Sequence, residues 1–304
     1  MMTYLKTLAA LLSLCFLAFS THTLASFKKA MDFYEQEQYT HALNHFLPEA
    51  EKGHVKAQLM LGRMYQAGRG DEVNPKQAYF WYEQAANQGD PEAMYRLGMA
   101  YLTFVDVRQS EVKAFKWIKQ AAEKSYTQAQ YQLGMMYKKG QGNGINMNKS
   151  RRWLFKAAQG NNVEAQYQLA RIYEDGPDGS QNYAEALRWY KMAAKYGHTR
   201  AELSLAYMYY YGLGTKTDLL SASNLLQRVA NKGVAVAQYN LGVLYEGYPK
   251  RKPNYVASMN WYKKACENNY LKACSNMKRA QDRYQNQLEL ALRDGSEDGR
   301  TANN

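Results

Sequence analysis

The sequence predicts an all-α solenoid in which antiparallel helix pairs repeat every 36 residues. Three observations lead to this prediction. Four kinds of residue recur at one spacing without an insertion, each repeat has two apolar stripes at helical spacing, and glycines separate the stripes. The composition agrees with a helical fold, because the 304 residues include only 6 prolines.

The repeat is defined by positions that keep one phase through six repeats. The alanine series is Ala57, Ala93, Ala129, Ala165, Ala201, Ala237 and Ala273. The leucine series is Leu61, Leu97, Leu133, Leu169, Leu205 and Leu241. The tyrosine series is Tyr65, Tyr101, Tyr137, Tyr173, Tyr209 and Tyr245. The tryptophan series is Trp81, Trp117, Trp153, Trp189 and Trp261, with Leu225 in the fifth repeat. One helix pair cannot bury its own apolar faces, so the repeats must stack, and we expect these side chains to form the core.

Each repeat is expected to contain a first and a second helix. In the first repeat, the first helix carries Leu61 and Tyr65 and ends at Gly68, because glycine readily adopts the left-handed conformation that follows a helix. The second helix carries Trp81 and ends at Gly89. The connection between them is short, so the two helices should be antiparallel neighbours.

A position in the repeat is named here by its residue number in the first repeat. Position 62 holds only glycine or alanine, at Gly62, Gly98, Gly134, Ala170, Ala206 and Gly242. A glycine inside a helix costs about 1 kcal/mol relative to alanine. Its recurrence therefore predicts that another helix passes very close to position 62.

Two segments carry a family resemblance. The residues Ala129–Gly142, AQYQLGMMYKKGQG, and the residues Ala186–Ala194, ALRWYKMAA, resemble the two halves of a Sel-1-like repeat. That family is related to the tetratricopeptide repeats, and the resemblance implies a right-handed α/α superhelix. It covers six repeats over residues 56–271, with a degenerate N-terminal repeat at 26–55. A C-terminal capping helix is expected at 272–292, followed by a disordered tail at 293–304.

The first 25 residues are predicted to be a signal peptide. Lys6 gives a positive start, and the apolar run from Leu8 to Phe19 is too short to span a bilayer. Small residues at Thr23 and Ala25 suit cleavage after Ala25. The mature protein is therefore expected in the periplasm or outside the cell, with no stable membrane insertion. An uncut membrane anchor is the alternative.

Two cysteines remain after cleavage, Cys266 and Cys274. Cys266 lies at the end of one helix, at the position of Ala86, and Cys274 lies at the start of the next, at the position of Met94. They face each other across a short turn, and we predict a disulfide in an oxidising compartment. The pair also resembles the cysteine-rich branch of the family. The alternative is two small buried residues.

The sequence lacks a recognisable catalytic set or cofactor site. His41, His45 and Glu49 have the spacing of one helix face, but His45 occupies the tryptophan position and is expected to pack rather than bind a metal. Some cysteine-rich relatives have been proposed to act on β-lactams. Three Ser-x-x-Lys segments occur, at Ser26, Ser110 and Ser275, but Ser-Asp-Asn and Lys-Thr-Gly elements are missing from the sequence. We expect no enzyme activity, cofactor or metal.

The resemblance to tetratricopeptide arrays implies that the first helices line the concave surface. Positions 59, 63, 66 and 67, which are expected to be exposed, then provide a candidate groove. Its members are Arg63, Met99, Met135, Lys138, Lys139, Arg171, Tyr207, Tyr210 and Tyr211. Tyrosine and arginine are common anchors of binding surfaces. The alternative is that the three extra tyrosines only pack against one another.

These observations favour a non-catalytic scaffold that binds a protein or peptide in the groove. The net charge of +12 favours anionic partners, so an anionic glycan or peptidoglycan is the second candidate ligand. An exported protein is not expected to meet nucleic acid. A hydrolase and a secreted host-interaction factor are the remaining alternatives.

Overall fold

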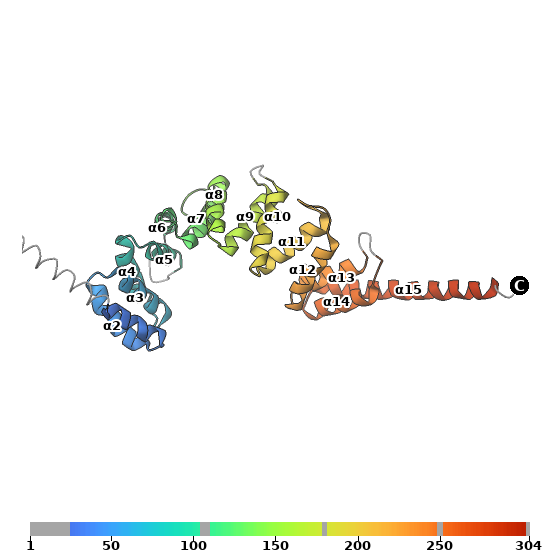
Figure 1. Cartoon of the computed structure of the whole chain (residues 1–304), viewed down its shortest axis with the longest axis horizontal. Helices are drawn as coiled ribbons and strands as arrows, with labels where there is room; N and C mark the ends of the chain where they lie inside the picture. The colour runs from blue at the N-terminus through green and yellow to red at the C-terminus, as the bar shows by residue number, and fades with distance from the viewer. Residues whose placement is uncertain (1–24, 104–109, 178–180, 248–251, 302–304) are drawn as a thin grey trace, which may run out of the picture. The chain divides into compact units, whose positions relative to one another are not determined.

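The structure, a computed structural model, describes residues 25–103, 110–177, 181–247 and 252–301, with side chains as far as residue 292. It confirms the predicted all-α solenoid, because consecutive helices form antiparallel pairs along the chain (Figure 1). The chain divides into two compact units, Met1–Asn162 and Val163–Asn304. Within each unit, the extensive helix contacts join helices that are consecutive in the sequence. The predicted signal peptide at 1–25 lies outside the described residues, except for its last position.

The first helices of the six repeats are α3 (Val55–Ala67), α5 (Pro91–Thr103), α7 (Thr127–Lys139), α9 (Val163–Asp175), α11 (Thr199–Tyr211) and α13 (Ala235–Tyr245). The second helices are α4 (Pro75–Asn87), α6 (Glu111–Glu123), α8 (Met147–Gln159), α10 (Tyr183–Lys195), α12 (Leu219–Asn231) and α14 (Tyr255–Glu267). A helix over residues 25–35 and α2 (Tyr39–Glu51) precede them. The helix α15 (Leu271–Thr301) follows them.

Each second helix begins at a polar capping residue that also recurs every 36 residues. The series is Asn74, Ser110, Asn146, Asn182, Asp218 and Asn254, and each side chain accepts a hydrogen bond from a backbone N–H in the first turn. The backbone N–H of Asn74 donates to the carbonyl of Tyr65 at 2.9 Å, and the equivalent bond is present in the other five repeats. The repeat tyrosine therefore fixes where the second helix starts.

The small residue at position 62 faces a large side chain from the second helix of the same repeat. A Cβ added to Gly62 would lie 2.5 Å from Cδ1 of Tyr82, and one added to Gly98 would lie 2.6 Å from Cγ1 of Ile118. This confirms the predicted close approach and identifies the second helix of the pair as the neighbour. At Gly62 and Gly98 these distances are too short for a side chain, whereas the fourth and fifth repeats have the small Ala170 and Ala206 at this position.

A second recurrent contact joins the start of some first helices to the end of the helix that precedes them. The buried Gln58 donates through Nε2 to the carbonyl of Ala50 at 2.9 Å, and Gln238 donates in the same way to Ala230 at 3.1 Å. Cys274 and Cys266 occupy these same two positions one repeat later. They form the predicted disulfide, with Cα atoms 5.1 Å apart. A covalent bond therefore replaces the recurrent hydrogen bond where α14 meets α15.

The capping helix α15 is held by an acidic residue of the last repeat. Glu246 accepts hydrogen bonds from Arg279 at 2.8 Å and Arg283 at 3.0 Å, and from the hydroxyl of Tyr262 at 2.8 Å. The helix continues to Thr301, past the predicted end at residue 292 and into the segment predicted to be disordered (Figure 1). The segment beyond residue 292 continues a helix that is already formed, so it needs no new nucleation, and it contains no proline.

The leucine, tyrosine and tryptophan series occupy the interior to different degrees. All six repeat leucines are buried. Tyr65, Tyr101, Tyr137, Trp81 and Trp189 are buried, whereas Tyr173, Tyr209, Tyr245, Trp117, Trp153 and Trp261 are half-buried. Across the described residues, no helix combines the length and the apolar character needed to cross a membrane.

Replacing Gly62 by alanine is expected to destabilise the first repeat. The new methyl group would force Tyr82, which is fully buried, or the helix backbone to shift. Such overpacking costs about 1–3 kcal/mol, and the gain in helix propensity of about 1 kcal/mol only partly offsets it. Urea unfolding measures the change. Gly144→Ala is the control, because a Cβ there meets nothing within 4 Å. A gain in stability of about 1 kcal/mol, the full helix-propensity effect without any overpacking, would contradict the assigned contact.

The disulfide predicts that unreduced protein lacking residues 1–25, and with them Cys15, has no free thiol. Thiol counting in denaturant tests this, and two free thiols would show that Cys266 and Cys274 are not bonded. The chain-entropy model gives a loss of about 2.5 kcal/mol when so short a loop is opened. We expect the double variant Cys266→Ala, Cys274→Ala to be less stable by this amount. The loss should be confined to the region where α14 meets α15, because units of a solenoid couple mainly to their neighbours.

Candidate functional site

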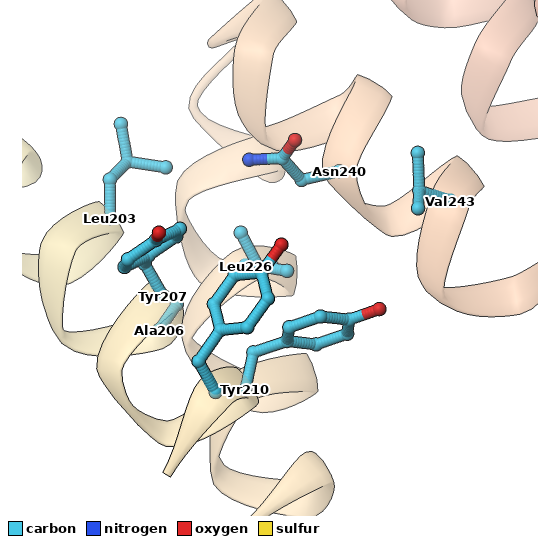
Figure 2. A pocket seen from close by; sticks show the side chains of 8 residues that line it. Leu203, Ala206, Tyr207, Tyr210, Leu226, Asn240 and Val243 are labelled. Carbon is cyan, nitrogen blue, oxygen red and sulfur yellow. The ribbon is translucent and has the colours of Figure 1, made fainter. Parts of the chain in front are cut away.

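The predicted groove residues lie on the first helices, and some of them line two pockets. The first, here called the tyrosine pocket, has a volume of about 250 Å³. Its lining comprises Leu203, Ala206, Tyr207, Tyr210, Tyr211, Leu226, Asn240 and Val243, from α11, α12 and α13 (Figure 2). The second, here called the arginine pocket, is a more open depression lined by Tyr34, Arg63, Gln66, Ala67, Arg69 and Arg96.

The three tyrosines of the tyrosine pocket form a cluster. The ring of Tyr211 lies 4.5 Å from that of Tyr207 and 4.8 Å from that of Tyr210, measured between centroids. Tyr210 is half-buried, but Tyr207 and Tyr211 remain 51% and 55% exposed. The tyrosines therefore pack on one another and still present aromatic surface to solvent.

The tyrosine pocket lies in one of the three repeats that lack a paired tyrosine, since the second and third repeats have Ile118 and Leu154 at the position of Leu226. In the first repeat, the hydroxyl of Tyr82 donates to Gln66 at 2.6 Å, and in the sixth repeat Tyr262 donates to Glu246. In the fourth repeat, the hydroxyl of Tyr190 donates to Glu174 at 2.5 Å. The fifth repeat has Leu226 and Tyr210 at these two positions. The shorter leucine leaves space beside α11, and Tyr210 borders it (Figure 2).

The arginine pocket is organised around one partly buried acid. Glu92 accepts hydrogen bonds from Arg63, including one from Nε at 3.1 Å, and from Nε of Arg96 at 2.7 Å. Arg69 donates to the hydroxyl of Tyr34, and its guanidinium lies 5.2 Å from the ring centroid of Tyr39. These contacts hold all three guanidinium groups in place.

Electrostatics favour the charged state of this cluster. Burial alone would raise the pKa of Glu92, but hydrogen bonds from Arg63 and Arg96 hold that pKa below its ordinary value. Burial also raises the pKa of Tyr82 to about 12, against the opposing effect of Arg96. Tyr82 is therefore a neutral donor at neutral pH, whereas Glu92 is an anion.

The two pockets have the same construction in the repeat. Positions 63, 66 and 67 supply Arg63, Gln66 and Ala67 in the first repeat, and Tyr207, Tyr210 and Tyr211 in the fifth. The first helix of the following repeat supplies Arg96 in one pocket and Asn240 in the other, and these two residues are also equivalent. The same repeat positions therefore line both pockets, but they carry different side chains.

The other predicted groove residues belong to neither pocket. Met99, Met135 and Lys138 are half-buried, and Lys139 is exposed at the end of α7. Arg171 is exposed and pairs with Asp175 on its own helix at 3.2 Å. These positions still lie on the first helices, but only the first and fifth repeats combine their groove residues into the two pockets described above.

The candidate metal and nucleophile residues have structural roles. The ring of Phe33 packs on both His41 and His45, at centroid distances of 5.4 and 5.2 Å. Ser110 caps α6 by accepting a hydrogen bond from the backbone N–H of Lys113 at 3.3 Å. In the part of the chain that the structure describes, no group of three or more histidine, cysteine, aspartate or glutamate side chains is placed to hold a metal ion.

Sequence reasoning missed the residues that complete the arginine pocket. Arg96 sits at position 60, which the helical pattern placed outside the groove, and Arg69 lies in the turn after α3. Tyr34 comes from the degenerate first segment, where the repeat phase is lost. One signal in the sequence could have indicated this pocket. Arg63 and Arg96 occupy repeat positions 63 and 60 of successive first helices, so two positive charges are expected near each other.

The repeat matches a known family. A family profile described as Sel1 repeat matches residues 55–90, 91–126, 127–162, 163–198, 199–234 and 235–270. The chain belongs to the Sel1 repeat family. A comparison with curated proteins finds no match.

Two solved structures show the same Sel1 repeat fold. One is a protective antigen of uropathogenic Escherichia coli with an SLR fold, which is 30% identical and has a TM-score of 0.78 over 84% of this chain. The match covers 56% of the antigen, so this chain spans little more than half of its length. The other is a Sel1 repeat protein from Oxalobacter formigenes, 26% identical with a TM-score of 0.68, matched over 79% of this chain and 99% of that one.

The lowered pKa of Glu92 predicts a specific loss of stability in acid. A group with a depressed pKa in the folded state stabilises the fold above its unfolded pKa, near 4.5, and loses this effect as the pH falls through the folded pKa. Melting temperatures of the unmodified protein and Glu92→Gln should therefore differ most at neutral pH and converge below pH 4.5. Parallel pH profiles of the two proteins would contradict the role assigned to Glu92.

Proposed function

We propose that this Sel1 repeat protein is a non-catalytic scaffold of the periplasm or cell exterior that binds a protein or peptide on its first helices. The tyrosine pocket carries this proposal. It combines exposed aromatic rings with an apolar floor of Leu203, Leu226 and Val243, and such a pocket suits a single apolar side chain. The membership in a repeat family related to protein-binding arrays agrees with it.

Two observations support the compartment. The Cys266–Cys274 disulfide is typical of proteins that fold in an oxidising environment. The N-terminal sequence has the charge, apolar length and small residues of an export signal. A secreted protein acting on a host is a special case of the same proposal.

An anionic glycan or peptidoglycan is the second candidate ligand. The net charge of +12 and the three guanidinium groups of the arginine pocket favour it. The two candidates differ in what the tyrosine pocket would hold: an apolar side chain of a protein, or the face of a sugar ring stacked on a tyrosine.

The double variant Tyr207→Ala, Tyr211→Ala tests the proposal. Both rings are more than half exposed, so we expect a stability change below about 1 kcal/mol, whereas loss of a binding anchor weakens affinity by about 2 kcal/mol or more. The measurement is recovery of proteins from cell-envelope extract on the immobilised mature protein, with thermal melting in parallel.

Tyr196→Ala provides the matched control. Tyr196 is 56% exposed and belongs to the same unit, but it lies outside the tyrosine pocket. A protein partner retained by the control and lost by the double variant supports the proposal. Equal recovery by both variants would rule out the tyrosine pocket as the binding site, and retention on purified peptidoglycan alone would favour the second candidate.

A further inference from the structure

The arginine pocket has an excess of positive charge. Arg63, Arg69 and Arg96 line it, and its lining includes no acidic residue. Glu92 balances one of the three charges and has a side chain that is only 18% exposed. Glu37 also acts on Arg69, but it is exposed, so solvent and salt screen its effect. An anion that enters the pocket therefore meets uncompensated guanidinium charge.

The guanidinium groups also keep hydrogen-bonding capacity. Each has five N–H donors. Arg63 uses Nε and one terminal nitrogen for Glu92 and its other terminal nitrogen for Sδ of Met60. Arg96 uses Nε for Glu92, and Arg69 uses one terminal nitrogen for Tyr34. More than half of the N–H donors of the three groups therefore remain available for a ligand. The groups are held in position before any ligand arrives, which reduces the entropy cost of binding.

We infer that the arginine pocket binds a carboxylate of an acidic peptide segment. This inference rests on the proposed function, because it assigns a ligand chemistry to the same face of the first helices. The planar guanidinium fork matches a carboxylate, with two parallel N–H···O bonds. The tyrosine pocket, built at the same repeat positions, has the apolar lining that suits a peptide side chain. The peptide class of this ligand comes from the proposed function, and the carboxylate comes from the charge of the arginine pocket.

Titration of a fluorescein-labelled deca-glutamate peptide into the mature protein tests the inference by fluorescence anisotropy. The corresponding deca-glutamine peptide is the probe control and should not bind. Arg69→Gln removes a guanidinium that is not paired with Glu92, and we expect it to weaken deca-glutamate binding about tenfold. Lys76→Gln is the matched control, because it removes one exposed positive charge from α4, outside the pocket.

A second variant gives a change of the opposite sign. Glu92→Gln removes the internal counter-ion of Arg63 and Arg96, and we expect binding about threefold tighter. Glu123→Gln changes the net charge equally but lies on α6, where Glu123 is exposed and pairs with Lys119, and it should leave affinity unchanged. Thermal melting of each variant verifies that the comparison is made on folded protein.

The outcomes separate this inference from the proposed function. Equal weakening by Arg69→Gln and Lys76→Gln, or no binding of deca-glutamate, overturns the arginine pocket as a carboxylate site. Displacement of the peptide by polygalacturonate at equal carboxylate concentration overturns the peptide assignment in favour of a glycan. If deca-glutamate fails to bind while Tyr207→Ala, Tyr211→Ala still loses its envelope partner, the inference fails and the proposed function stands. The opposite result is also informative. If deca-glutamate binds at the arginine pocket and the tyrosine variant still recovers its partner in full, the carboxylate site stands and the tyrosine pocket is overturned as the binding site.

Discussion

The close approach of the two helices in each repeat is the constraint on which the other features depend. Position 62 admits only glycine or alanine because the side chain at position 82 lies against the helix backbone. The N-cap of each second helix adds a second fixed point, through its bond to the carbonyl of the repeat tyrosine. Together, these contacts set the geometry of a helix pair before it meets its neighbours.

The same contact determines how the surface of the first helices varies. A tyrosine at position 82 needs an acceptor at position 66, and Tyr82 with Gln66 and Tyr262 with Glu246 satisfy this requirement. Leu226 needs no acceptor, which releases position 66 of the fifth repeat for Tyr210. A choice made for packing inside the pair therefore becomes a difference in the chemistry offered to a ligand.

The junction between repeats shows that one geometry accepts several chemistries. Position 58 holds Gln58 and Gln238 with hydrogen bonds to a carbonyl, and it holds Cys274 in a disulfide. In the fifth repeat it holds Glu202, which is buried and pairs with Arg228 at 2.7 Å and Lys232 at 2.8 Å. The covalent version occurs at the last junction, where α15 has a repeat on one side only and fewer neighbours to hold it.

Periodicity in the sequence determined the helix pairs, the leucine core, the tight contact at Gly62 and the cysteine pair, because each follows from residues at a fixed spacing. It also placed Arg63 and Tyr207 at one groove position. Periodicity did not predict the arginine pocket, because Tyr34 comes from a segment without the repeat phase and Arg69 from a turn. Nor did it predict how far α15 extends, because no apolar residue marks the helix between residues 293 and 301. Only the tertiary structure brings together side chains such as Arg63 and Glu92, which lie 29 residues apart and meet across two helices.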